Sequence, residues 1–301
     1  MKSLKGYIFI LLATIFWGIS ATIAKFLFTH EIETLILVQT RTTFSALLML
    51  LYFLIFKRHL LHIQLKDFYM FMLVGIIGVA GSNFTYYFTI QQTNVATAIL
   101  IQYMAPLLVL IYAAVSKEEN LSWVKIIAAL ISISGCYLAV TGKDLSILNI
   151  SRLGLLTGVA SAFCWAFTNV SLRHVLKHYT VWTVLVYSFI SAAVFWLFFN
   201  SPSTIFQQHY STQTWWTFVG FALISVLIPH SLYFNGLRHI TASRAIITGT
   251  FEPIVAIVTS FIFLNAILTP IQVLGAVLVI IAILFLQMKR DPSEEINDRS
   301  T

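Results

Sequence analysis

The chain has 301 residues, of which 59% are hydrophobic and only 10% are Asp, Glu, Lys or Arg. Soluble globular proteins carry about 25% charged residues, so this composition excludes a water-soluble fold, a disordered chain and a nucleic-acid-binding protein. The net charge of +7 can instead indicate membrane topology, because Lys and Arg collect on the cytoplasmic side of membrane proteins. The two cysteines, Cys136 and Cys164, lie in apolar runs and show neither a disulfide framework nor a metal-type spacing. The sequence predicts an all-α integral membrane protein.

A helix that crosses the hydrocarbon core of a bilayer needs about 20 mostly apolar residues. Runs of this kind predict ten transmembrane helices, near 6–27, 34–56, 68–89, 93–115, 122–142, 153–173, 181–199, 215–236, 242–264 and 267–288. Most connections are short and leave no room for a soluble domain. The longest predicted loop is 200–214, and residues 289–301 form a polar, charged tail that is expected to be disordered in the cytoplasm.

The distribution of Lys and Arg predicts the orientation of the chain. If the N-terminus is cytoplasmic and ten helices alternate, 14 basic residues fall on the cytoplasmic side. Three, Lys25, Lys143 and Arg152, fall on the opposite side, and Arg41 lies inside a span. This excess predicts that both termini are cytoplasmic. The first apolar run could be mistaken for a signal peptide, but its length and its recurrence at 151–173 indicate a first helix.

The two halves of the chain resemble each other. The residue pairs that match at an offset of 147 or 148 positions are Gly6 and Gly154, Trp17 and Trp165, Tyr86 and Tyr233, Ala98 and Ala245, and Pro106 and Pro253. Each half holds five predicted spans, an odd number, so the second half enters the membrane from the opposite side. Such an inverted-topology repeat is a common architecture of secondary transporters. We therefore expect two five-helix repeats, at 5–142 and 151–288.

Three segments carry a resemblance to a known family. They are LLATIFWGISATIAKF, then NVATAILIQYMAPLLVLIYA followed by KEENLSWVKIIAALISISGCYL, and ASRAIITGTFEPIVAIVTSFIFLNAILTPIQVLGAVLVIIAIL. On these segments the chain resembles the drug/metabolite transporter superfamily, in its ten-helix form with two EamA-type domains. The resemblance implies transport of amino acids, other metabolites or drugs. The chain departs from the family pattern in one place. Family halves often carry an acidic residue before their final helix; the first half has Glu118 and Glu119 there, whereas the second half has Asn265. This difference puts a symmetric end-loop interaction in doubt.

Three ionisable side chains are predicted at membrane depth, where a charge costs about 2.5–3.5 kcal/mol on insertion scales. Glu252 is interpreted as a carboxylate that couples protons or binds a substrate amine. Its alternative role is a structural partner of Arg41 or of the backbone freed by Pro253. Arg41 is expected either to bind a substrate carboxylate or to balance Glu252. His230 is interpreted as a packing histidine, with a proton relay as the alternative.

Other side chains are expected to shape a central site. Pro106 and Pro253 interrupt equivalent helices, which points to a role in helix shape or gating. Trp17 and Trp165 lie in mid-helix rather than at the membrane interface, so they are expected to form a cavity wall. The polar candidates are Asn83, Tyr86, Tyr87, Gln102, Tyr103 and Asn169. Polar tips on an aromatic lining suit a medium-sized organic substrate, with an amine or aromatic group as one option.

The prediction for function is a secondary transporter that exports a small organic metabolite by alternating access. A facilitative uptake carrier or an exchanger is the alternative within this class. An intramembrane enzyme would need paired catalytic groups, and no span contains an Asp or an HExxH motif. No cofactor and no metal are expected. The expected partners are the substrate, the lipid bilayer and a coupling proton, in a bacterial inner membrane; substrate identity and oligomeric state are left open.

Overall fold

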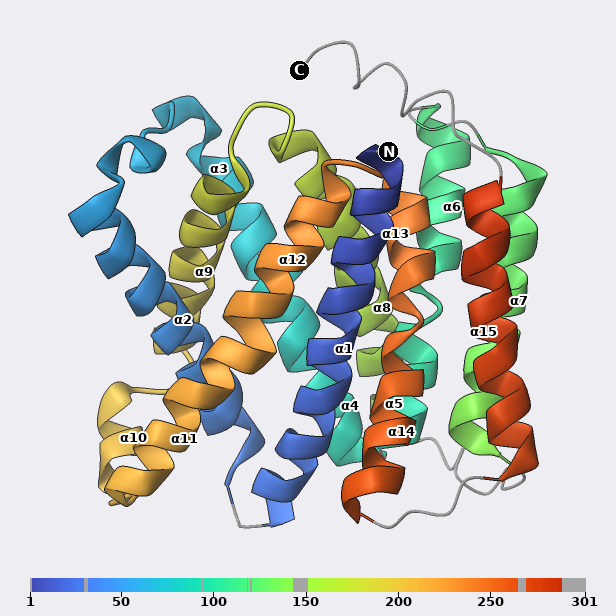
Figure 1. Ribbon diagram of the computed structural model, residues 1–301. Helices are drawn as coiled ribbons and strands as arrows, with labels where there is room; N and C mark the ends of the chain where they lie inside the picture. The colour runs from blue at the N-terminus through green and yellow to red at the C-terminus, as the bar shows by residue number, and fades with distance from the viewer. Residues whose placement is uncertain are drawn as a thin grey trace.

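The computed structural model describes residues 2–29, 32–93, 95–117, 119, 121–142, 151–264 and 269–288. Throughout these residues the regular structure is helical (Figure 1). The predicted tail 289–301, Glu118 and Asn265 lie outside the described residues.

The first repeat contains long and interrupted helices. Its elements are α1 (Lys2–Thr29), α2 (Thr34–Phe56), η1 (Arg58–Leu61), η2 (Leu65–Asp67), α3 (Phe68–Leu73), the π-helical segment η3 (Val74–Gly81), α4 (Ser82–Gln92), α5 (Val95–Gln102), α6 (Ala105–Ser116) and α7 (Trp123–Thr141). The second repeat follows the same order. Its elements are α8 (Arg152–Val175), α9 (Val181–Leu197), α10 (Pro202–Gln207), α11 (Thr212–Ala222), the π-helical segment η5 (Leu223–Leu227), α12 (Ile228–Leu237), α13 (Ala242–Gly249), α14 (Glu252–Leu264) and α15 (Pro270–Met288).

Within the described part of the chain, nine helical stretches are long and apolar enough to cross a membrane. A further apolar helix, Val181–Leu197, has 17 residues and corresponds to the predicted span 181–199. The segment 200–214, predicted as the longest loop, contains the short helix α10, and its last residues belong to α11, which begins at Thr212. Ser201 caps α10 by accepting a hydrogen bond from the Ser203 amide, and Pro202 favours a helix start there.

Both repeats are interrupted at equivalent places. The segments η3 and η5 lie at the same position once the offset of 147 residues is applied. The second interruption separates α5 from α6 at residues 103–104, and α13 from α14 at residues 250–251. Each of these breaks comes shortly before a proline, Pro106 or Pro253, which lacks an N–H and crowds the preceding turn. The shared interruptions bring irregular backbone to the middle of the bundle.

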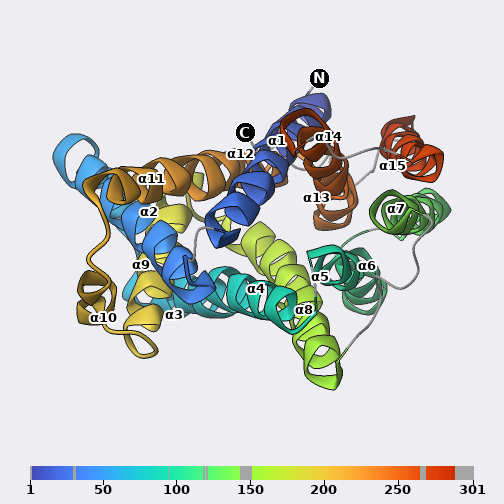
Figure 2. The same ribbon diagram turned by 90° about the horizontal axis from the view of Figure 1, so that it is seen from below.

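Equivalent helices of the two repeats make equivalent contacts. Helix α1 packs against α12 as α8 packs against α4, and α7 pairs with α15 at one side of the molecule (Figure 2). Glycines permit the closest approaches. A Cβ atom on Gly275 of α15 would lie only 2.3 Å from the Ala139 nitrogen of α7, and one on Gly236 of α12 would lie 3.0 Å from the Gly6 oxygen of α1.

Candidate functional site

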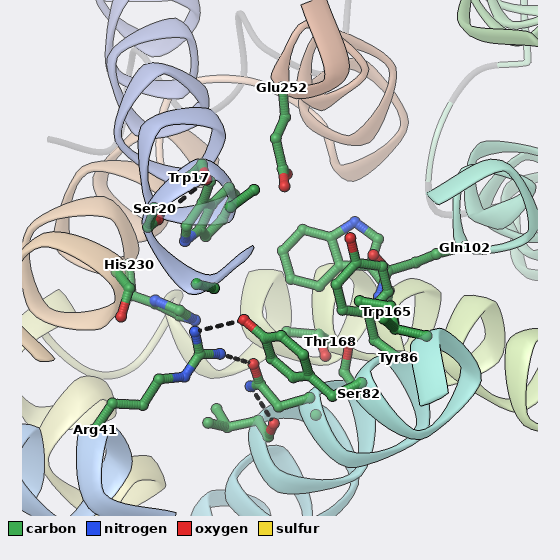
Figure 3. Close-up of a pocket in the computed structure, with 18 of the residues that line it drawn as sticks. Trp17, Ser20, Arg41, Ser82, Tyr86, Gln102, Trp165, Thr168, His230 and Glu252 are labelled. Atoms are coloured by element: carbon green, nitrogen blue, oxygen red, sulfur yellow. Dashed lines mark hydrogen bonds between the residues drawn. The ribbon is translucent and has the colours of Figure 1, made fainter. Parts of the chain in front are cut away.

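A cavity lies between the two repeats, close to their interrupted helices (Figure 3). Its volume is about 110 Å³. One water molecule needs about 10–15 Å³ on the same scale, so the space is that of a small solute rather than of a large drug. Of the predicted binding residues, the cavity is lined by Trp17, Arg41, Asn83, Tyr86, Tyr87, Gln102, Tyr103, Trp165, His230 and Glu252.

Arg41 reaches the cavity from α2, where it is buried. Its guanidinium donates one hydrogen bond to the Tyr87 hydroxyl at 3.0 Å and another to the side-chain oxygen of Asn83. The same group lies 5.1 Å from the centre of the Tyr87 ring and 5.9 Å from that of Phe221. All of these partners are uncharged.

Glu252 comes from the opposite repeat and begins α14 immediately after the helix break. The Tyr103 hydroxyl lies 2.8 Å from Glu252 Oε2 and 3.2 Å from the Gly249 carbonyl oxygen. Tyr103 itself lies at the equivalent break between α5 and α6. One hydrogen-bond system therefore joins the two interrupted helices. In this structure Glu252 forms no ion pair with Arg41.

Aromatic rings form a further wall of the cavity. The Trp17 ring centre lies 5.6 Å from that of Trp165, 5.2 Å from that of His230 and 5.1 Å from that of Tyr233. Trp17 and Trp165, which the sequence analysis assigns to a cavity wall, both line this cavity (Figure 3). His230 packs its ring among these side chains, with Nδ1 2.9 Å from the Val226 carbonyl oxygen.

Three of the predicted residues lie behind the cavity surface. Asn169 accepts a hydrogen bond from the Tyr233 hydroxyl at 2.5 Å and donates one to the Trp165 carbonyl at 2.8 Å, so it supports the aromatic wall. Pro106 and Pro253 are buried beside the helix breaks and are absent from the lining. Both prolines therefore affect the cavity through the backbone, at the breaks between α5 and α6 and between α13 and α14.

The remaining lining residues, most of them small, were missed by sequence reasoning: Ser20, Ala21, Ala24, Gly78, Val79, Ser82, Ile90, Thr168 and Ser225. The hydroxyls of Ser20, Thr168 and Ser225 donate to carbonyls of their own helices, which is a common arrangement in apolar helices and gives no distinct signal. One signal was available: Gly78 and Ser225 are separated by the repeat offset of 147.

The chemistry of the cavity is that of a binding site for a small polar organic molecule. A fixed cation lies on one wall, a carboxylate on another, and aromatic rings lie between them (Figure 3). Among the described residues, no three His, Cys, Asp or Glu side chains converge on a common point where a metal ion could bind.

Two repeats of apolar helices around a central cavity define a multi-pass membrane protein of the transporter type. The chain belongs to the EamA-like transporter family, which it matches over residues 4–141 and 152–288. It is a transporter and not an enzyme, and it falls within the drug/metabolite transporter superfamily that the sequence resembles.

Similar proteins agree with this family. An uncharacterized inner membrane transporter of Salmonella typhimurium, YicL, is 24% identical, over 94% of this chain and 95% of YicL. An uncharacterized transporter of Bacillus subtilis, YyaM, is 27% identical, over 94% of each chain. The threonine/homoserine exporter RhtA of Escherichia coli is 25% identical, over 66% of this chain and 64% of RhtA. A protein crystal structure with 16% sequence identity has the same fold, with a TM-score of 0.74, and covers 95% of this chain and 96% of that one.

Proposed function

We propose that the protein is a secondary transporter that exports a small organic metabolite across a bacterial inner membrane by alternating access. The observation that carries the proposal is the central cavity, which side chains of both repeats line. The similarity to RhtA, named as a threonine/homoserine exporter, supports export and a substrate of amino-acid size. The similarity to YicL, named as an inner membrane transporter, supports the location.

The repeats are inserted in opposite directions, and both termini are cytoplasmic. Two sets of contacts support this topology. Gly6, at the start of α1, packs against Ile240 after α12, whereas Gly154, at the start of α8, packs against Thr93 after α4. With helices that alternate in direction, Thr93 lies at the far end of the bundle from Gly6. The two repeats therefore begin at opposite ends, and the excess of Lys and Arg assigns the Gly6 end to the cytoplasm.

At the proposed cytoplasmic end, polar contacts hold the repeats together. The Glu119 carboxylate accepts hydrogen bonds from the Ala242 amide, at 2.9 Å, and from the Ser243 hydroxyl. Lys125, which is almost fully buried, lies 3.2 Å from the same carboxylate. An acidic group at the start of α13 is also favoured by the helix dipole. We call Glu119, Lys125, Ala242 and Ser243 the cytoplasmic latch.

A second bond crosses the same end, where Arg244 of α13 donates to the Tyr7 hydroxyl of α1 at 2.8 Å. Arg244 and Tyr7 lie in opposite repeats, as do Glu119 and Ser243. These contacts support the proposal that this conformation is closed to the cytoplasm. Admission of substrate from the cytoplasm requires these contacts to separate, while the cavity closes on the other side.

Glu252 is the proposed coupling carboxylate. Its charge, together with the bond to Tyr103, lies where both interrupted helices meet, so a change in its protonation alters a contact between the repeats. The other titratable or charged groups in the same region are Arg41, Tyr86, Tyr87, Tyr103 and His230 in the cavity lining and Cys136 in the adjacent apolar cluster. In this proposal, an incoming proton and the exported substrate would occupy the same cavity at different stages of the transport cycle.

The test uses proteoliposomes with a mixed pool of amino acids and metabolites, assayed with and without a pH gradient. We expect one class of compound to move and the gradient to accelerate it. In Glu252→Gln the gradient should no longer accelerate transport. Unchanged pH dependence in this variant would remove Glu252 from the coupling role, and transport that ignores the gradient in the native protein would indicate a facilitator or exchanger.

A further inference from the structure

We infer that Arg41 binds an anionic group of the transported molecule, so that substrates carry a carboxylate or phosphate group and purely cationic compounds are not transported. This inference rests on the proposed function and names the substrate class of the same cavity. The observations that carry it are the burial of Arg41, its unfilled hydrogen bonds and the neutral character of its partners.

The hydrogen bonds of Arg41 are incomplete. A guanidinium group has five N–H donors. In the structure, two of them are directed at Tyr87 and Asn83, and Nε is buried without a hydrogen-bond partner among the described residues. Arg41 is only 6% exposed, so its guanidinium is buried at the wall of the cavity rather than on the outer surface. A ligand with several acceptor oxygens would accept its remaining hydrogen bonds, and carboxylates and phosphates match the planar guanidinium best.

The positive charge of Arg41 also has no carboxylate in direct contact among the described residues. Within the described part of the chain, no Asp or Glu lies within 4.0 Å of its guanidinium. Glu252, the carboxylate in the cavity lining, is engaged with Tyr103 on another wall. The rings of Tyr87 and Phe221 offer cation–π contacts, which are weaker than an ion pair with a desolvated anion. A buried, unpaired charge is unfavourable, and an anionic ligand would relieve it.

The guanidinium is held in a fixed position, as a binding site requires. Asn83 and Tyr87 are four residues apart on α4, so both side chains lie on one face of the helix. The Asn83 amide donates to the Val79 carbonyl at 2.6 Å, which turns its oxygen toward Arg41. Figure 3 shows the resulting arrangement, with the guanidinium directed into the cavity between α2 and α4. An anion that enters would meet a pre-oriented partner.

The first experiment measures the melting temperature of the purified, substrate-free full-length protein. Arg41→Gln removes a buried charge that has no carboxylate in direct contact among the described residues, and this variant should melt at the same temperature or a higher one. The matched control is Arg173→Gln, because Arg173 donates to the carbonyls of Leu237 and Ile240, a structural role, and its loss should lower the melting temperature. If Arg41→Gln lowers the melting temperature as far as Arg173→Gln does, Arg41 is a structural residue and the inference is wrong.

The second experiment measures uptake into proteoliposomes with pairs of compounds that differ only in the acidic group. L-threonine is paired with L-threoninamide, and glycerol 3-phosphate with glycerol; tetraphenylphosphonium serves as a purely cationic probe. We expect the acidic member of one pair to be transported at least about tenfold faster than the member that lacks the acidic group. The preferred pair then distinguishes a carboxylate from a phosphate. Arg41→Gln should abolish this preference.

The outcomes separate the inference from the proposed function. Uptake is counted after subtraction of uptake into protein-free liposomes, because tetraphenylphosphonium crosses bilayers unaided. If the compounds that lack the acidic group or the cationic probe then move as fast as the acids, in the native protein and in Arg41→Gln alike, the protein is a transporter and the proposed role of Arg41 is wrong. If none of the compounds moves, the proposed function loses support. The melting comparison of Arg41→Gln with Arg173→Gln still decides whether Arg41 is a structural residue or a buried charge without a carboxylate partner in the substrate-free protein.

Discussion

The two repeats share a scaffold but differ in the chemistry that they bring to the cavity. At the position equivalent to Arg41, the second repeat has Ser188, and at the position equivalent to Glu252, the first repeat has Ala105. Each repeat therefore contributes one charge, on opposite walls. A duplicated scaffold can exchange two conformations, whereas a single asymmetric site gives the substrate one orientation.

The residues that hold Arg41 also differ between the two repeats. The residues equivalent to Asn83 and Tyr87, which hold Arg41, are His230 and Phe234 in the second repeat. His230 packs among aromatic rings and its ring centre lies 6.0 Å from that of Phe234. Polar side chains in one repeat thus correspond to aromatic packing in the other. The comparison separates positions that maintain the scaffold from positions that maintain the site.

The largest effect is expected from a change in the scaffold. In Gly275→Ala the new Cβ would lie 2.3 Å from the Ala139 nitrogen and 2.5 Å from the Gly135 oxygen, so α7 and α15 must separate. Overpacking of this kind costs about 1–3 kcal/mol or more, because backbone atoms cannot move aside. The melting temperature of the purified protein should fall well below that of Gly220→Ala, where no other atom lies within 4 Å of the added carbon. Equal melting temperatures in the two variants would contradict the close packing of α7 on α15.

The next effect tests the hydrogen bond between the interrupted helices. Tyr103→Phe removes the hydroxyl that contacts Glu252 and Gly249. A hydrogen bond to a charged group contributes about 1.5–3 kcal/mol, so transport should fall roughly tenfold or more. The control is Thr250→Val, at the equivalent position of the second repeat, since Thr250 donates to the Ile247 carbonyl of its own helix. Similar transport rates in both variants would show that the Tyr103 bond has no special role.

Much of this organisation could be predicted from the sequence. Apolar runs, repeated aromatic residues and paired prolines indicate the helices and the two repeats, because burial in lipid requires long apolar helices and leaves few alternatives. Long-range pairings have no such signal. The bonds from Arg41 to Asn83 and Tyr87 depend on how α2 packs against α4, and the helix at Pro202–Gln207 depends on a local cap within a polar segment.

Glu119 illustrates the limit most clearly. Sequence reasoning noted an acidic residue before the last helix of the first repeat but had no means to identify its partners, Ala242 and Ser243, which are more than 120 positions away. The small hydroxyl residues of the cavity are a second case. Ser20 and Thr168 are common types of residue in apolar helices, and only the fold brings them to one surface.

A smaller effect is expected at the cytoplasmic latch. Ser243→Ala removes one hydrogen bond to the Glu119 carboxylate and should favour opening of that end of the bundle. Hydrogen exchange of the backbone amides in 236–245 should accelerate severalfold, because local opening exposes them. The amides of α9, which packs elsewhere, provide the internal reference. If exchange in 236–245 is unchanged, the hydroxyl of Ser243 does not help to keep the latch closed.

The smallest effect concerns two tyrosines in connecting segments of the second repeat, each near a carboxylate of the first repeat. At Tyr179, a hydrogen bond to Asp67 raises the pKa of the phenol, whereas at Tyr210 burial is the main cause of a raised pKa and the Glu33 carboxylate the lesser one. A raised pKa favours the neutral phenol, so each contribution to stability is present below the ordinary value of about 10 and is lost as the pH rises through the raised pKa.

Asp67→Asn should therefore return the pKa of Tyr179 most of the way to its ordinary value. Glu33→Gln should lower that of Tyr210 only in part, because burial remains. The measurement is a pH titration of ring-labelled tyrosine by NMR, with Tyr179→Phe and Tyr210→Phe to assign the signals. An equal response of the two tyrosines would mean that the same interaction dominates in both segments.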